Sequence, residues 1–118
     1  MNKVEYLEAV VACEVDSKRV DQVETLYKIK VSELLAKVIS YAGQVTFFDE
    51  ERRALSFEGI MYASEDIGVD FIERKMIPVI DAYDLNYIVY MAEENTWAIY
   101  NGADDDIFEE AESLENVL

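Results

Sequence analysis

The stretch KMIPVIDAYDLNYIVYMAEENTWAIYN, residues 75–101, decides the fold class of this chain. Its segments LNYIVYM and TWAIY are rich in β-branched and aromatic residues, which favour strands. Only AEEN separates these segments, so together they predict an antiparallel hairpin. MIPVI, just before them, predicts another short strand. Its Pro78 indicates an edge position or a bulge, because proline cannot donate a hydrogen bond to a neighbouring strand.

The N-terminal third of the sequence predicts helices instead. Ser32 is a good N-cap for the segment VSELLAKVISYAG, and Gly43 is a natural stop for it. Further along, Ser56 and Gly68 bracket a shorter helix in SFEGIMYASEDIG. We expect the apolar stripes at helical spacing to be core faces: Val4, Leu7, Val10 and Val11; Val20, Val23, Leu26 and Tyr27; Leu34, Leu35, Val38 and Ile39.

Two further segments complete the predicted elements. QVTFF, residues 44–48, predicts a strand, and Ser113 begins a last helical turn, SLENVL, that we expect to dock on the sheet. Helices come first and a meander-like sheet follows, which predicts an α+β fold. N-terminal helices would pack on a mixed, mostly antiparallel sheet, with a short C-terminal helix. The 118 residues, without a repeat or linker, predict one domain spanning residues 1–118.

The predicted strands carry aromatic residues on both faces. Alternation places Tyr87, Val89 and Met91 on one face, and Ile88 and Tyr90 on the other. One set belongs to the core, and the other is either an exposed aromatic face or covered by a helix. Trp97 has the same two interpretations, since tryptophan is enriched at interface hot spots but is also a common core residue.

Negative charge is concentrated in the C-terminal part of the sequence. The chain has 26 acids, 10 bases and a net charge of −16. Residues 1–40 hold seven acids and six bases, whereas residues 76–118 hold eleven acids and no base. Such a field repels nucleic acid and anionic membranes, and it attracts basic proteins. One-signed stretches favour an interaction surface, although plain solubility is the competing interpretation.

Residue types that the sequence lacks argue against several kinds of chemistry. There is no histidine, so the usual general base and the commonest metal ligand are missing. The one cysteine, Cys13, cannot form an internal disulfide, and we interpret it as a small buried residue in a reducing cytoplasm. Neither a signal peptide nor an apolar run of membrane-spanning length is found. We therefore expect a cytoplasmic protein without catalytic residues, cofactor or metal.

The order of several segments resembles small bacterial members of the SUKH superfamily, which is named partly for a yeast cell-wall synthesis regulator. These segments are ISYAG, VTFFDEERRALSFEGI, SEDIGVDF, the stretch 75–101 and SLENVL. The resemblance runs from about Val20 to the C-terminus. Its most specific part is the IP-containing strand, an aspartate and a D-x-NYIVY strand. The chain departs from the family pattern at Val31 and Ser32, where members often have leucine-proline. This difference concerns which subfamily the chain resembles and not the fold.

The resemblance implies an α+β fold without enzyme activity. Many bacterial members look like immunity proteins, which bind and neutralise a cognate toxin, often a nuclease. A nuclease cleft is usually basic, so an acidic inhibitor complements it. We accordingly predict a basic toxin domain as partner, with no nucleic acid or membrane bound. The candidate partner-binding residues are Asp81, Asp84, Tyr87, Trp97, Asp104, Asp105, Asp106, Glu109 and Glu110.

Other interpretations remain open at this point. The acidic stretch 101–115 could be only a solvated connector. The protein could instead be a regulatory or scaffolding module, or a nucleic-acid mimic. A hydrolase using carboxylate pairs such as Asp81 and Asp84 is weakly supported, because a pair needs a cleft and a defined separation. Asp104–Asp106 lack the residue order of an EF-hand calcium loop. We expect a monomer or a weak homodimer.

Overall fold

The computed structural model describes residues 2–42 and 52–118, and it has the α+β fold that the sequence predicts. Helices form the first part of the chain, and strands dominate the rest. In chain order the elements are α1 (Lys3–Ala12), α2 (Ser17–Tyr27), α3 (Glu33–Tyr41), β1 (Arg53–Ala54), α4 (Phe57–Ile67), β2 (Met76–Asp81), β3 (Asn86–Met91), β4 (Thr96–Asn101), β5 (Asp106–Ala111) and the 3-10 turn η1 (Leu114–Val117).

The strands form a sheet in the order β1-β2-β3-β4-β5. Every strand pair described is antiparallel, which confirms the expected meander-like, mostly antiparallel sheet; none of the described pairs is parallel. The predicted hairpin is confirmed, because Tyr90 of β3 lies opposite Trp97 of β4. The bulge predicted at Pro78 is confirmed as well, since the β2–β3 register shifts between Pro78 and Ile80.

Side-chain caps explain where the helices begin. Ser32 accepts a hydrogen bond from the Leu35 N–H at 3.3 Å, and Ser56 accepts one from the Gly59 N–H at 3.1 Å, as predicted. Gly68 ends α4 in the left-handed conformation at φ 70°, which glycine adopts without a steric penalty. The predicted stop at Gly43 and the predicted strand 44–48 lie outside the described residues.

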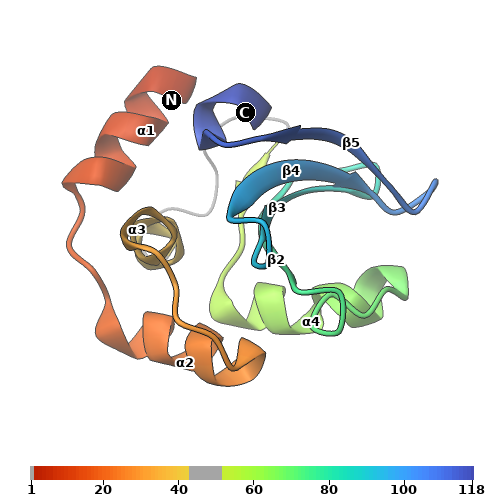
Figure 1. Cartoon of the computed structure of the whole chain (residues 1–118). Coiled ribbons are helices and arrows are strands. Elements are labelled where there is room, and N and C mark those ends of the chain that lie inside the picture. The colour runs from red at the N-terminus through yellow and green to blue at the C-terminus, as the bar shows by residue number, and fades with distance from the viewer. Residues whose placement is uncertain (1, 43–51) are drawn as a thin grey trace.

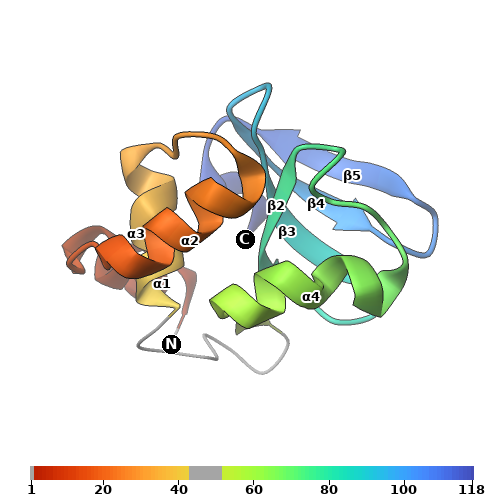
Figure 2. The same cartoon turned by 90° about the horizontal axis from the view of Figure 1, so that it is seen from below.

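Helices cover both faces of the sheet. Figure 1 shows α4 beneath the sheet, with α1, α3 and η1 gathered on the opposite side. Figure 2 shows the same arrangement from below, with α2 and α4 nearest the viewer. A buried hydrogen bond ties the helical part to the sheet, because the Tyr27 hydroxyl of α2 donates to the Met76 carbonyl oxygen of β2 at 2.8 Å.

Both faces of the central strands are therefore core. Tyr87, Ile88, Val89 and Tyr90 are all buried, so the interpretation in which a helix covers the second face is correct. The predicted docking of the last turn is confirmed too, since Leu114 and Val117 of η1 are buried. η1 contacts β4 and β5.

The apolar stripe predicted for the first helix is wrong in part. Tyr6 and Val10 are the buried residues of α1, whereas Val4 and Val11 are 57% and 59% exposed. Tyr6 packs edge-on against Tyr41 of α3, with ring centroids 5.8 Å apart. The position of α3 therefore selects the tyrosine side of α1 for the core.

Candidate interaction surface at the acidic end of the sheet

Two turns lie side by side at one end of the sheet, and together they hold most of the predicted acidic residues. One turn joins β2 to β3, and the other joins β4 to β5. The Gly102 N–H of the second turn donates to the Leu85 carbonyl oxygen of the first at 2.7 Å. The Asn101 side-chain amide donates to the Asn86 side-chain oxygen at 2.7 Å. We call residues 81–86 and 101–106 the acidic end.

The β2–β3 turn has an unusual backbone. Its residues Tyr83, Asp84 and Leu85 have φ values of 61°, 51° and 64°, in the left-handed region. This conformation costs a non-glycine residue about 1–2 kcal/mol. The turn is held by hydrogen bonds at both ends, since the Tyr83 N–H donates to the Asp81 carboxylate at 2.8 Å and the Ala82 N–H donates to the Asn86 carbonyl oxygen at 2.9 Å. Strained conformations of this kind concentrate at functional sites.

The same turn exposes large apolar side chains among the acids. Tyr83 is 38% exposed and Leu85 is 46% exposed. A tight approach of the neighbouring turn fixes their position, because a Cβ atom at Gly102 would lie 3.1 Å from the Ile67 side chain and 3.3 Å from the Leu85 carbonyl oxygen. Exposed apolar residues rimmed by charge are typical of protein-binding surfaces.

Asp105, one of the predicted contact residues, already has a cationic partner. Arg74, in the α4–β2 connection, forms a two-pronged ion pair with Asp105, and the Tyr100 hydroxyl donates to the same carboxylate at 2.6 Å. The hydrogen bonds from Arg74 and then Tyr100 lower the pKa of Asp105 from 3.8 to about 2. We therefore assign Asp105 to holding the β4–β5 turn, with Asn101 accepting the Asp104 N–H at 2.8 Å.

Asp81 also has an internal role. Its carboxylate lies 3.2 Å from the Arg53 guanidinium of β1, and it accepts the N–H of the left-handed turn. Asp84, Asp104 and Asp106 are exposed at the same end of the sheet. The carboxylates of these three residues are consequently accessible to solvent at the acidic end.

Glu109 and Glu110 lie further along, on β5. The acidic stretch is thus partly a strand, and the interpretation of it as a solvated connector is wrong for residues 106–111. The Glu110 carboxylate accepts a hydrogen bond from the Thr96 hydroxyl at 2.7 Å. Phe108, between the acidic end and Glu109, is 51% exposed.

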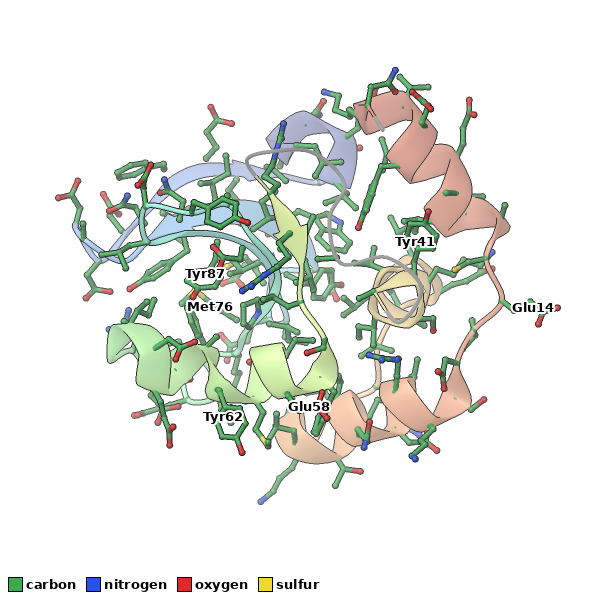
Figure 3. All side chains as sticks on the ribbon, turned by 180° about the vertical axis from the view of Figure 1, so that it is seen from behind. Glu14, Tyr41, Glu58, Tyr62, Met76 and Tyr87 are labelled. Atoms are coloured by element: carbon green, nitrogen blue, oxygen red, sulfur yellow. The ribbon has the colours of Figure 1, made fainter. Side chains whose placement is uncertain are left out.

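Tyr87 and Trp97 do not belong to this surface, which corrects their assignment as partner-binding residues. Their side chains are only 6% and 3% exposed. Tyr87 packs edge-on against Phe71 with ring centroids 5.7 Å apart, and Trp97 packs in the same way against Tyr90 at 5.0 Å. Figure 3 shows Tyr87 between the sheet and α4, whereas Tyr62 points away on the far side of that helix.

Sequence reasoning missed the apolar part of the surface. Tyr83 and Leu85 stand in DAYDLN, a connection between two strands that contains no glycine although its backbone is left-handed. A tyrosine and a leucine in so short a connection were the available signal, because turn positions usually hold small or polar residues. The pairing of Arg74 with Asp105 crosses thirty-one residues and left no local pattern.

Further features of the described residues concern metal ligands, membrane spans and surface hollows. In residues 2–42 and 52–118, no three His, Cys, Asp or Glu side chains are grouped to hold a metal ion. Over the same residues, no helix is long and apolar enough to cross a membrane. A surface hollow of about 660 Å³ between α2 and α4 is lined by Lys18, Asp21, Gln22, Thr25, Leu26 and Phe57. It contains one carboxylate, so it offers no acid–base pair of the kind that a glycosidase uses.

Comparisons with protein families, with curated protein sequences and with solved structures give no match for this chain. The resemblance to the SUKH superfamily therefore rests on the sequence segments given above and stays a prediction. The class that fold and surface define is an α+β protein with an acidic, partly apolar end.

Proposed function

We propose that this chain is a non-enzymatic binding protein that neutralises a basic toxin domain, in the manner of an immunity protein. One observation carries the proposal: two adjoining turns place the exposed carboxylates of Asp84, Asp104 and Asp106 around the exposed side chains of Tyr83 and Leu85. Aromatic and aliphatic anchors dominate binding energy at interface centres, while surrounding charges govern encounter and specificity. A surface of this composition suits a protein partner better than a small substrate.

The charge indicates the kind of partner. Residues 76–118 contain no lysine or arginine, so the strands β2 to β5 and both turns carry only negative formal charge. A protein that binds nucleic acid presents the opposite sign in its cleft. A nuclease toxin is therefore the partner class we propose, and blocking its cleft would neutralise it.

The experiment begins with capture of partners by the tagged protein from lysate of its source organism, at low and at moderate salt. We expect one dominant basic protein. The purified partner is then tested for toxicity in cells with and without this chain, and for nuclease activity. Rescue of growth by the wild-type chain is the expected result. Several weakly held partners, lost at moderate salt and without rescue, would favour the regulatory or scaffolding module instead.

A charge-matched pair of variants tests the surface. The triple variant Asp84→Asn, Asp104→Asn, Asp106→Asn removes three charges and keeps side chains that tolerate left-handed turns. The control triple variant Glu8→Gln, Glu14→Gln, Asp21→Asn removes three charges from exposed positions in the helical part. We expect the first variant to slow association with the partner at least about tenfold and the second to leave it nearly unchanged. Equal rates for the two variants would remove the acidic end from the proposal.

A further inference from the structure

The outer side of β5 is an open edge of the sheet. β5 is the last strand in the sheet order, and no strand in the described part of the chain pairs with its outer side. Phe108, Glu109 and Glu110 are exposed along it, and Figure 1 shows β5 as the outermost strand. An edge strand presents backbone N–H and C=O groups that can pair with another strand.

The register identifies a backbone group that faces outward. Gly102 directly follows β4, and its N–H donates to the carbonyl oxygen of Leu85, which directly precedes β3. The backbone groups of Gly102 therefore point toward the β3 side of β4. Alternation then directs the backbone groups of Ile99 toward β5, where Glu109 lies opposite. Glu110, the next residue, consequently directs its N–H and C=O groups away from the sheet.

The side chains along this edge determine which charge a strand pairing there should carry. Residues 104–112 contain six acids and no base. Two copies of the chain paired through β5 would bring carboxylates opposite carboxylates, which destabilises strand pairing. A strand carrying lysine or arginine would instead place opposite charges across the pair, which stabilises it. The edge therefore discourages self-association and favours a basic strand.

We propose that β5 binds an extended, basic strand of the partner protein, which adds a sixth strand to the sheet. This inference rests on the proposed function, since it specifies how the same partner is held. Backbone hydrogen bonds supply affinity in such strand addition, and pockets or charges at alternate side chains supply specificity. The exposed ring of Phe108 gives an apolar contact, and the exposed carboxylates of Glu109 and Glu110 meet the partner's cations.

The probe is a synthetic seven-residue peptide in which lysine alternates with valine or threonine. It is titrated into the full-length, ¹⁵N-labelled protein while amide signals and amide hydrogen exchange are recorded. We expect the largest shifts along β5, and slower exchange at the Glu110 amide when the peptide is in excess. The control is the same peptide N-methylated at alternate residues, which keeps its charge but cannot donate the backbone hydrogen bonds. We expect the control to bind at least about tenfold more weakly.

Two variants of the protein test the same backbone hydrogen bonds by altering β5 instead of the peptide. Glu110→Pro removes an outward N–H at an edge position, where proline is tolerated. Glu110→Gln removes the charge and keeps the N–H. We expect at least about tenfold weaker peptide binding for the proline variant, and a change of less than about threefold for glutamine. Thermal unfolding of each variant verifies that the fold is retained.

Three results would overturn the inference. These are equal binding of the methylated and unmodified peptides, unchanged peptide binding by the proline variant, and no shift along β5 at millimolar peptide. In each case the edge acidity serves only to prevent strand pairing. The proposed function stands or falls separately, because it depends on rescue of cells from the captured partner and not on the peptide.

Discussion

Replacement of Trp97 by alanine should strongly destabilise the protein without involving any partner. Trp97 lies in β4, which has strands on both sides, and its side chain is 3% exposed. Its ring packs edge-on against Tyr90 with centroids 5.0 Å apart and planes inclined at 71°. The indole is thus surrounded by core, and its removal leaves a cavity between fixed strands.

The expected loss follows from the buried area. A buried tryptophan removes roughly 150–250 Å² from water, which at about 25 cal/mol per Å² corresponds to about 4–6 kcal/mol as an upper bound. Large-to-small substitutions of core aromatic residues cost about 3–5 kcal/mol. We therefore expect Trp97→Ala to lower the free energy of unfolding by about 4 kcal/mol. Domains are stable by only about 5–15 kcal/mol, so the variant would be marginal.

The assay is urea unfolding followed by far-ultraviolet circular dichroism, because the substitution removes the fluorescent probe. Trp97→Phe is the control and should lose roughly half as much, since it keeps an aromatic ring next to Tyr90. In the wild-type chain, tryptophan emission should be that of a buried indole and should red-shift on unfolding. A loss below about 1 kcal/mol for Trp97→Ala would refute the reasoning, because such a value is typical of surface substitutions.

Two further predictions concern polar contacts. Replacing Arg74 by methionine should raise the pKa of Asp105 from about 2 toward its ordinary value of 3.8, as measured by carboxyl ¹³C chemical shifts during an acid titration. Because folding lowers this pKa, the stabilisation from Asp105 is complete above about pH 4 and is lost as the pH falls toward 2. The free energy of unfolding of the methionine variant, measured against pH, should not show this loss. The same pH dependence in the variant and the wild-type chain would contradict the ion pair. Replacing Tyr27 by phenylalanine removes the hydroxyl that donates to the Met76 carbonyl oxygen at 2.8 Å, so unfolding in urea should require about 1–2 kcal/mol less; an unchanged midpoint would show that the bond contributes nothing.

Local signals predicted the elements whose ends are set by local chemistry. The hydroxyls of Ser32 and Ser56 accept backbone N–H groups where helices begin. Gly68 ends a helix because, without a side chain, it adopts the left-handed conformation readily. The β3–β4 hairpin was predictable because β-branched and aromatic residues flank a short connection. Pro78 marked the bulge because it lacks an N–H group.

The remainder depended on contacts between distant segments. β5 was missed as a strand because aspartate and glutamate are depleted in strands, and only its edge position leaves them in water. Val4 and Val11 have the same spacing as a core stripe, but α3 packs on the other side of their helix. Trp97 could not be assigned from sequence, since alternation gives its face of the sheet and not whether a helix covers that face.

In the candidate site, too, local sequence predicted some features and contacts between distant segments decided the others. Sequence composition identified the acids, but it did not show that Asp105 is held by Arg74 or that Asp81 is held by Arg53. Both pairs join residues about thirty positions apart in the chain. Only the fold therefore separates acids that stabilise the turns from acids that face the surroundings.

The arrangement of charge gives the molecule an electric dipole. Figure 1 shows the β4–β5 turn and α1 at opposite sides of a body whose longest extent is 35 Å. Residues 76–118 carry eleven acids and no base, while residues 1–40 are nearly balanced. A field from a cationic cleft exerts a torque on such a body and turns its sheet end forward. Screening limits this torque to roughly the last 8 Å of approach at physiological salt, so the body would be turned only when the two surfaces are already close together.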